Sequence, residues 1–171
     1  CVYNDIIDRD LDAKVARTRA RPLASGAVSL RAAWIWLFML CAIGLIVLMQ
    51  LNPAAIAVAL GSIALVAAYP FMKRITWWPQ IWLGLVFSWG VPVGWAAVVG
   101  ANNLAPALLL YFGAVLWVVG YDTIYALQDA EDDALAGIGS SARAMGSHVR
   151  AGVALCYALA LTLWCAAFWQ I

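Results

Sequence analysis

The sequence has few charged residues and no carboxylate at all between Ala13 and Tyr121. Only 11% of its 171 residues are charged, whereas an ordinary soluble domain carries about 25%. It has one histidine, and its four cysteines lack the spacing of a metal-binding motif. These shortages exclude an ordinary soluble domain, and the formal net charge of +1 gives no reason to expect a nucleic-acid partner.

In place of charge, the chain has long apolar runs. Hydrophobic residues make up 66% of it, and about 20 consecutive apolar residues suffice to cross a lipid bilayer. We predict an all-α, polytopic transmembrane helical bundle with spans at about 31–51, 53–72, 79–99, 104–121 and 150–171. Because the chain opens beside a functional-looking motif and stops inside an apolar run, we expect a single transmembrane domain, an internal fragment of a larger bundle truncated at both ends.

The distribution of basic residues predicts the orientation of these spans. With five spans, the connections alternate between the two sides of the membrane. Every lysine and arginine then falls on one side, which the positive-inside rule makes the cytoplasmic side. Both groups of acidic residues lie on that side too, so we expect a site that opens toward the cytoplasm, or toward the matrix if the membrane is the mitochondrial inner one.

All nine acidic residues fall in two short blocks, one near each end of the chain. At about 100° per residue, one helical stripe holds Asn4, Asp5, Asp8 and Asp12, and a similar stripe holds Asp122, Tyr125, Asp129 and Asp133. Asp10 and Asp132 fall off these stripes, and we leave them out of the site. The two blocks therefore predict two acidic helices that face each other, although merely solvated carboxylates are the alternative.

Carboxylates that lie side by side repel each other and need a cation. Oxygen ligands without histidine or cysteine favour a hard cation such as Mg²⁺, which typically bridges carboxylates to phosphate oxygens. Arginines hold phosphate or carboxylate groups bidentately. The basic side chains that we expect to assist are Arg17, Arg21, Lys73, Arg74 and Arg143.

The two blocks resemble the aspartate-rich motifs of the UbiA-type intramembrane prenyltransferases. The first reads Asn4-Asp5-x-x-Asp8-x-x-x-Asp12 and the second Asp122-x-x-Tyr125-Ala126-x-x-Asp129-x-x-x-Asp133. The resemblance continues through Arg21-Pro22-Leu23-Ala24-Ser25-Gly26 and through Gly137-Ile138-x-Ser140-Ser141. The loop from Tyr69 to Gln80 is most similar to that of the branch that acts on 4-hydroxybenzoate in ubiquinone biosynthesis.

This resemblance implies a multi-pass enzyme of an inner membrane, bacterial or mitochondrial, which folds as a nine-helix bundle around a central cavity. It implies that polyprenyl diphosphate is bound through Mg²⁺ and that its polyprenyl group is transferred to the carbon ortho to the hydroxyl of 4-hydroxybenzoate. We expect no obligate protein partner. The implied metal-binding and catalytic residues are Asp5, Asp8, Asp12, Asp122, Asp129 and Asp133. The implied substrate-binding residues are Asn4, Arg17, Arg21, Lys73, Arg74, Tyr125 and Arg143.

Several alternatives stay open at this stage. Either Arg21 or Arg74 can hold the benzoate carboxylate, and Tyr125 either contacts the diphosphate or is an ordinary interfacial tyrosine. Leu135 and Gly139 stand where family members often have lysines. We interpret Gly90-x-x-x-Gly94 as a helix-packing face, with a kink at Pro92 as the alternative. Another aromatic or quinone precursor is the alternative acceptor, and a cation transporter is the alternative from a different class.

Overall fold

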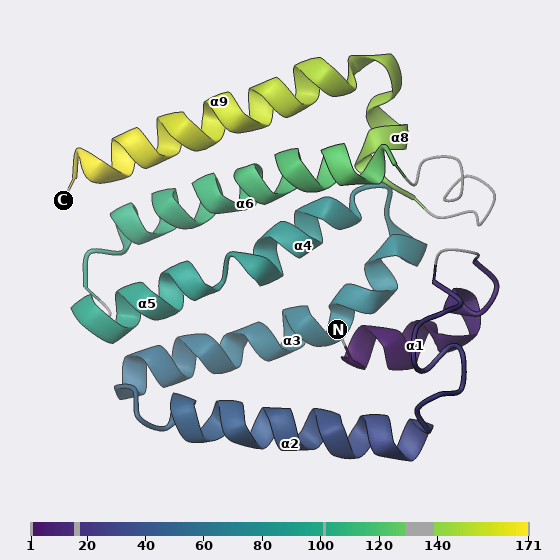
Figure 1. Cartoon of the computed structure of the whole chain (residues 1–171). Coiled ribbons are helices and arrows are strands. Elements are labelled where there is room, and N and C mark those ends of the chain that lie inside the picture. Colours follow the sequence, from purple (N-terminus) through teal and green to yellow (C-terminus); the bar gives the residue numbers. More distant parts are fainter. Residues whose placement is uncertain (1, 16–17, 101, 129–138, 171) are drawn as a thin grey trace. The chain divides into compact units, whose positions relative to one another are not determined.

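The computed structural model describes residues 2–15, 18–100, 102–128 and 139–170. These residues form helices and turns, and no strand occurs among them. The helices are α1 (Val2–Asp12), α2 (Leu30–Leu48), α3 (Pro53–Ile75), α4 (Pro79–Phe87), α5 (Gly90–Val99), α6 (Leu104–Ala126), α8 (Ser141–Met145), the 3₁₀ helix η1 (Gly146–His148) and α9 (Val149–Phe168) (Figure 1). Five helical segments are long and apolar enough to cross a membrane. The predicted all-α transmembrane fold is confirmed.

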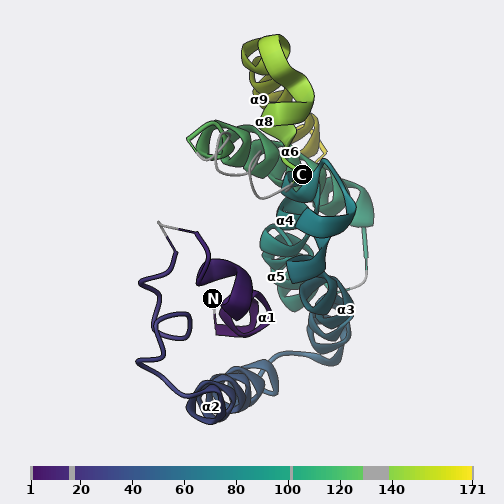
Figure 2. The ribbon, with the colours of Figure 1, turned by 90° about the vertical axis from the view of Figure 1, so that its right-hand side faces the viewer.

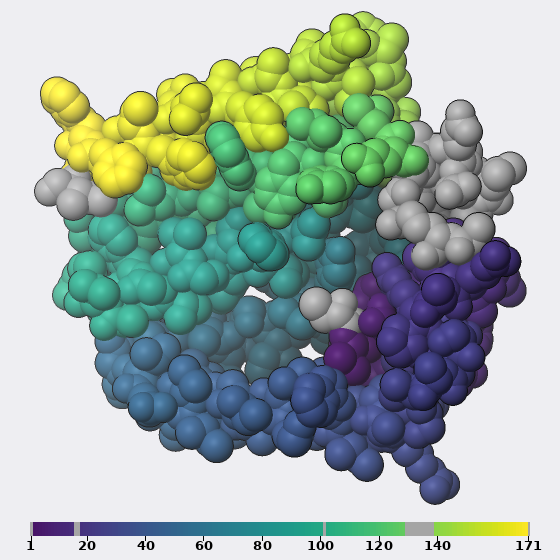
Figure 3. Space-filling view, in the orientation of Figure 1, coloured from purple at the N-terminus to yellow at the C-terminus, as the bar shows by residue number. Residues whose placement is uncertain are grey.

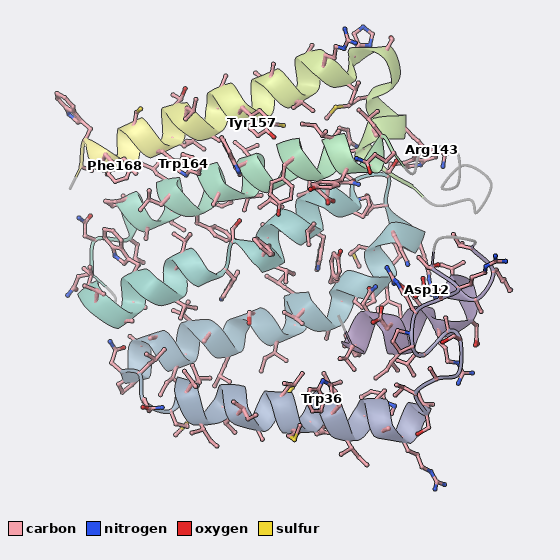
Figure 4. All side chains as sticks on the ribbon, in the orientation of Figure 1. Asp12, Trp36, Arg143, Tyr157, Trp164 and Phe168 are labelled. Atoms are coloured by element: carbon pink, nitrogen blue, oxygen red, sulfur yellow. The ribbon has the colours of Figure 1, made fainter. Side chains whose placement is uncertain are left out.

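The chain divides into two units, Cys1–Gln50 and Leu51–Ile171. The first unit consists of α1, a loop and α2. Ser29 Oγ accepts a hydrogen bond from the backbone N–H of Ala32 at 3.2 Å, which caps the start of α2. The apolar side chains of α2 are exposed almost all round, as Trp36 illustrates in Figure 4, which is the pattern of a helix that is surrounded by lipid or by other helices.

The second unit is a row of helices in which each contacts the next. α3 packs against α4 and α5, these two pack against α6, and α6 packs against α9. Both views of the ribbon show this order (Figures 1 and 2). In the most apolar stretch of α6, 44% is buried inside the structure, against at most 17% in the other spans. α6 is therefore the central helix of the unit.

The third span is broken in its middle. The helix predicted at 79–99 consists of α4 and α5, which are separated by Ser88 and Trp89. Pro92 has no N–H to donate to Ser88, and the N–H of Val91 donates to the Ser88 carbonyl instead, at 3.0 Å. An added Cβ at Gly90 would have no neighbour within 4 Å among the described residues. The structure therefore shows the kink, and our packing interpretation of these glycines is wrong for the described part of the chain.

Indole N–H groups join neighbouring helices within the apolar layer. Trp82 Nε1 donates to the carbonyl of Leu65 and Trp89 Nε1 donates to that of Val58, each at 2.8 Å, so that α4 and its C-terminal break are tied to α3. Trp164 Nε1 donates to the Leu110 carbonyl and ties α9 to α6. Buried polar groups need such partners where water is scarce.

α6 and α9 approach closely because α6 has glycine at the contact. A Cβ on Gly113 would meet the indole of Trp164, and one on Gly120 would lie 2.8 Å from the ring of Tyr157. Figure 4 labels both aromatic residues on the side of α9 that faces α6. In the space-filling view the two helices touch along their length (Figure 3).

Candidate active site

Helix α1 carries the first set of predicted metal ligands on one side. Asp8 is fully buried (0% exposed) and Asp12 is 6% exposed, while Asn4 and Asp5 are half-buried. Asp10 has 85% of its side chain exposed and pairs with the adjacent arginine at 3.1 Å. The helical stripe that we read from the sequence thus separates the buried acidic residues of α1 from the exposed one.

The loop after α1 turns back and brings Arg21 to this acidic stripe. Thr18 Oγ1 donates to the carbonyl of Asp12 at 3.0 Å, and the backbone N–H of Arg21 donates to the Thr18 carbonyl at 2.9 Å. Arg21 Nη1 then lies 3.1 Å from Asp5 Oδ1 and 2.9 Å from Asp12 Oδ2. One guanidinium nitrogen therefore bridges two carboxylates that are about two helical turns apart.

This bridge shows that Asp5 and Asp12 share one positively charged partner, the Arg21 guanidinium. Carboxylate oxygens are the ligands that Mg²⁺ prefers, and two carboxylates that converge on one point need a positive partner there. The donor set of α1 therefore fits Mg²⁺. Among the described residues, no group of three or more histidine, cysteine or acidic side chains gathers closely enough to hold a metal, so α1 by itself does not complete a coordination shell.

The second acidic block is described only in part. α6 continues to Ala126, beyond the predicted end of its span at 121, so that Asp122 and Tyr125 are both helical. Asp122 is half-buried and Tyr125 is 62% exposed. Asp129 and Asp133 lie outside the described residues, as does Arg17 of the first loop. Their predicted roles, and the pairing of the two acidic helices, stay predictions.

Predicted basic residues gather where α3 ends and α8 begins. Lys73 and Arg74 lie in the last turn of α3. Figure 4 labels Arg143 at α8. Its guanidinium carbon lies 5.1 Å from the centroid of the Trp77 ring, within the range of a favourable cation–π contact. The structure thus brings Arg143 to the segment that follows Lys73 and Arg74.

A buried polar network holds this end of the unit together. Thr123 Oγ1 lies 2.6 Å from Ser141 Oγ, and the backbone N–H of Ser141 donates to Gln80 Oε1 at 3.0 Å. All three residues are at most 5% exposed. No role for Gln80, Thr123 or Ser141 was predicted from the sequence. Two features of the sequence could have pointed to them: Gln80 is a polar residue at the start of an apolar helix, and Thr123 directly follows Asp122.

Gly139 explains one departure from the family pattern. Its backbone N–H donates to the Lys73 carbonyl at 3.4 Å. A Cβ at this position would lie 2.6 Å from the carbonyl oxygen of Thr76 and 3.0 Å from the Cα of Trp77. A lysine here would need the backbone to move, so the close approach of the two chain segments requires glycine.

Comparison with known proteins agrees with these features. The model of the UbiA prenyltransferase family matches residues 1–171. A mitochondrial 4-hydroxybenzoate polyprenyltransferase of Drosophila melanogaster is 46% identical over 99% of this chain and 43% of its own length. A 4-hydroxybenzoate geranyltransferase 2 of Lithospermum erythrorhizon is 49% identical over 88% of this chain and 49% of its own length.

A solved structure is also similar. The apo structure of a UbiA homolog from Aeropyrum pernix K1 matches with a TM-score of 0.81 and 34% identity, over 95% of this chain and 62% of that one. The chain thus spans less than half the length of the curated relatives named above. The acidic helix with its bridging arginine, the transmembrane row of helices and these matches agree, and they show that the chain belongs to the UbiA prenyltransferase family.

Proposed function

We propose that the protein containing this chain transfers a polyprenyl group from polyprenyl diphosphate to 4-hydroxybenzoate, as a step of ubiquinone biosynthesis. The observation that carries the proposal is the 46% identity, over nearly the whole chain, to a relative named for this reaction. The arrangement of Asp5, Asp12 and Arg21 supports it, because carboxylates and a guanidinium in contact provide both a metal-binding surface and a phosphate-binding group.

In this proposal the acidic residues hold the diphosphate through Mg²⁺. Mg²⁺, when bound, would stabilise the negative charge of the departing diphosphate. The metal-side residues are Asp5, Asp8, Asp12, Asp122, Asp129 and Asp133. Asn4, Arg17, Lys73, Tyr125 and Arg143 contribute hydrogen bonds or positive charge around the diphosphate. Arg21, which bridges Asp5 and Asp12 in this structure, would pair with diphosphate oxygens once Mg²⁺ was bound by the acidic residues.

The chemical step exchanges one bond of the prenyl group for another. The allylic C–O bond breaks, and its electron pair leaves with the diphosphate. The ring carbon ortho to the phenolic hydroxyl then forms a C–C bond with the prenyl group, and loss of the proton from that carbon restores aromaticity. The apolar helices exclude water, which otherwise competes with the ring for the electron-poor prenyl carbon.

We propose that Arg74 holds the benzoate carboxylate, with Arg21 as the alternative, because Arg74 lies in the segment from Tyr69 to Gln80 that is most similar to the branch acting on 4-hydroxybenzoate. Arg74→Ala is then expected to raise the Michaelis constant for the aromatic acid at least about tenfold, as expected when a charged hydrogen bond is lost, and to raise that for the prenyl donor much less. Steady-state kinetics with each substrate varied in turn measures this. The reverse pattern would move Arg74 to the diphosphate and return the carboxylate to Arg21.

The protein is a multi-pass integral membrane protein. We further propose that it resides in a bacterial or mitochondrial inner membrane with the acidic ends of α1 and α6 on the cytoplasmic or matrix side. The segregation of lysine and arginine to one set of connections supports this orientation.

The test uses membranes that contain the full-length protein. They receive 4-hydroxybenzoate and a polyprenyl diphosphate, with Mg²⁺ or with excess EDTA, and the lipid-soluble 3-polyprenyl product is measured by mass spectrometry. Product formed only with Mg²⁺ supports the whole proposal. Diphosphate released only with another aromatic or quinone precursor would keep the family and change the acceptor. No transfer to any acceptor would overturn the proposed reaction.

A further inference from the structure

A buried polar network lies beside the second acidic block, outside the acidic stripe. Thr123 and Ser141 are 0% exposed and Gln80 is 5% exposed. They come from three different helices, α6, α8 and the first turn of α4. Buried polar side chains weaken packing unless they are paired. Apolar side chains could fill the same space without fixed partners. Hydrogen-bonded polar side chains, by contrast, favour the one arrangement of the three helices in which all are paired.

Ser141 donates both hydrogen bonds that join the three helices. Thr123 Oγ1 donates its only proton to the carbonyl of Val119, at 2.6 Å. At the 2.6 Å contact between the two hydroxyl groups, Ser141 must therefore be the donor and Thr123 the acceptor. The backbone N–H of Ser141 donates to Gln80 Oε1 at 3.0 Å. Ser141 thus bonds α6 through its side chain and α4 through its backbone.

The network lies between two groups of predicted site residues. Thr123 directly follows Asp122 in α6, and Gln80 is separated from Lys73 and Arg74 only by the turn that joins α3 to α4. Two further contacts join the same segments: Gly139 N donates to the carbonyl of Lys73, and Arg143 lies over the ring of Trp77.

We infer that Gln80, Ser141 and Thr123 are positioning residues, which set Asp122 at a fixed place relative to the basic turn of Lys73 and Arg74. This inference rests on the proposed prenyl transfer, in which Asp122 and the basic residues serve the same diphosphate. In this inference the three side chains act through Asp122 and the basic turn and not on the reacting atoms. Misplacing a binding group by about 1 Å costs up to about 100-fold in rate, so the network acts on turnover more than on substrate binding.

Thr123→Val in the full-length protein tests this inference, because valine has the shape of threonine without the hydroxyl. Thr162→Val on α9 is the matched control: Thr162 Oγ1 makes the same bond to the carbonyl four residues earlier, at 2.8 Å to Ala158, and is exposed. We expect Thr123→Val to lower kcat about 10-fold or more, with both Michaelis constants within about threefold. Thr123→Ser, which keeps the hydroxyl, restores kcat, and Thr162→Val leaves it unchanged.

Amide hydrogen exchange gives a second measurement that does not depend on turnover. Peptides that cover 139–145 should exchange faster in Thr123→Val than in Thr162→Val, because α8 has lost its bond to α6. Ser141→Ala removes the donor hydroxyl while leaving the backbone bond to Gln80, and serves if Thr123→Val does not fold; it is expected to shift kcat and exchange in the same direction.

The outcomes separate this inference from the proposed function. Unchanged exchange and unchanged kcat in both Thr123→Val and Ser141→Ala would overturn the inference, as would a loss that Thr123→Ser does not restore. A wild-type protein that does not prenylate 4-hydroxybenzoate would overturn the proposed function. In that case, faster exchange of 139–145 with no change in the control would still support the network as the bond between α6 and α8.

Discussion

At the residue scale, Arg21 is the side chain whose position changes the interpretation of the first acidic block most. The sequence placed it among basic residues that assist a diphosphate. In the structure its Nη1 contacts Asp5 and Asp12, and its positive charge offsets the negative charges of the two carboxylates. Because one nitrogen, Nη1, contacts both carboxylates, a single positively charged nitrogen is enough for the bridge, and the second terminal nitrogen of the guanidinium is not needed.

Arg21→Ala is therefore expected to lower the stability of the ligand-free protein, and Arg21→Lys to retain most of it. The pairs are partly exposed, so we expect a loss of only about 1 kcal/mol for alanine. Thermal unfolding in detergent without metal measures the change. The matched control is Arg19→Ala, which removes an exposed arginine from the same loop. Equal effects of Arg21→Ala and Arg19→Ala would mean that the bridge contributes nothing.

The close approach at Gly139 gives a second prediction at the residue scale, for the stability of a Gly139→Ala variant. A Cβ there would lie 2.6 Å from the Thr76 carbonyl oxygen, and overpacking of this kind costs about 1–3 kcal/mol. Gly139→Ala should lower the unfolding temperature. Gly44→Ala is the control, because an added Cβ on α2 meets nothing within 4 Å and helix propensity favours alanine by about 0.5–1 kcal/mol. A Gly139→Ala protein as stable as wild type would contradict the close approach.

At the element scale, the helix positions and the acidic stripe of α1 were predictable from the sequence, because apolar length and 3.6-residue periodicity are local properties. The break at Ser88 and Trp89 was expected only as an alternative, since Pro92 permits a kink without requiring one. The close contacts of Gly113 and Gly139 were not predictable at all. They depend on which helix lies opposite, and a single sequence does not contain that information.

The packing of α6 on α9 is the element-scale feature that is easiest to test. Gly113 faces Trp164, and an added Cβ would also lie 3.2 Å from the Ala160 carbonyl oxygen. Gly113→Ala should push the helices apart and destabilise the protein by about 1–3 kcal/mol. Gly94→Ala in α5, where nothing lies within 4 Å, should not. Heating each variant in detergent and following the loss of the monodisperse peak on gel filtration compares them; equal midpoints would mean that α6 and α9 tolerate a wider separation.

At the scale of the whole molecule, the proposed reaction needs both acidic blocks to act on one ligand. Residues of α1 belong to one unit and those of α6 to the other, so a joint site stays a prediction from the sequence. The sequence supports it because the spacing of four residues between carboxylates occurs twice, at Asp8 and Asp12 and again at Asp129 and Asp133. Composition alone, by contrast, indicates only a membrane protein.

A joint site predicts that Mg²⁺ and diphosphate bind cooperatively. A ligand at about 100 times its dissociation constant stabilises the folded state by about 2.7 kcal/mol, which for a protein of this size or larger raises the unfolding temperature by up to about 10 °C. We expect that rise when Mg²⁺ and inorganic diphosphate are added together to the full-length protein, and little rise with either alone. A cation transporter would respond to the metal alone.

Asp8 and Asp10 make this measurement specific to the acidic stripe. Both are aspartates of α1, but Asp8 is fully buried, while Asp10 has 85% of its side chain exposed. Asp8→Ala should abolish both the joint stabilisation and prenyl transfer, because it removes a carboxylate from the face that Arg21 bridges. Asp10→Ala should keep both, since its side chain points away from that face. If the two variants respond alike, the helical phase of α1 does not select the ligands, and the metal-bound diphosphate must be held by other residues.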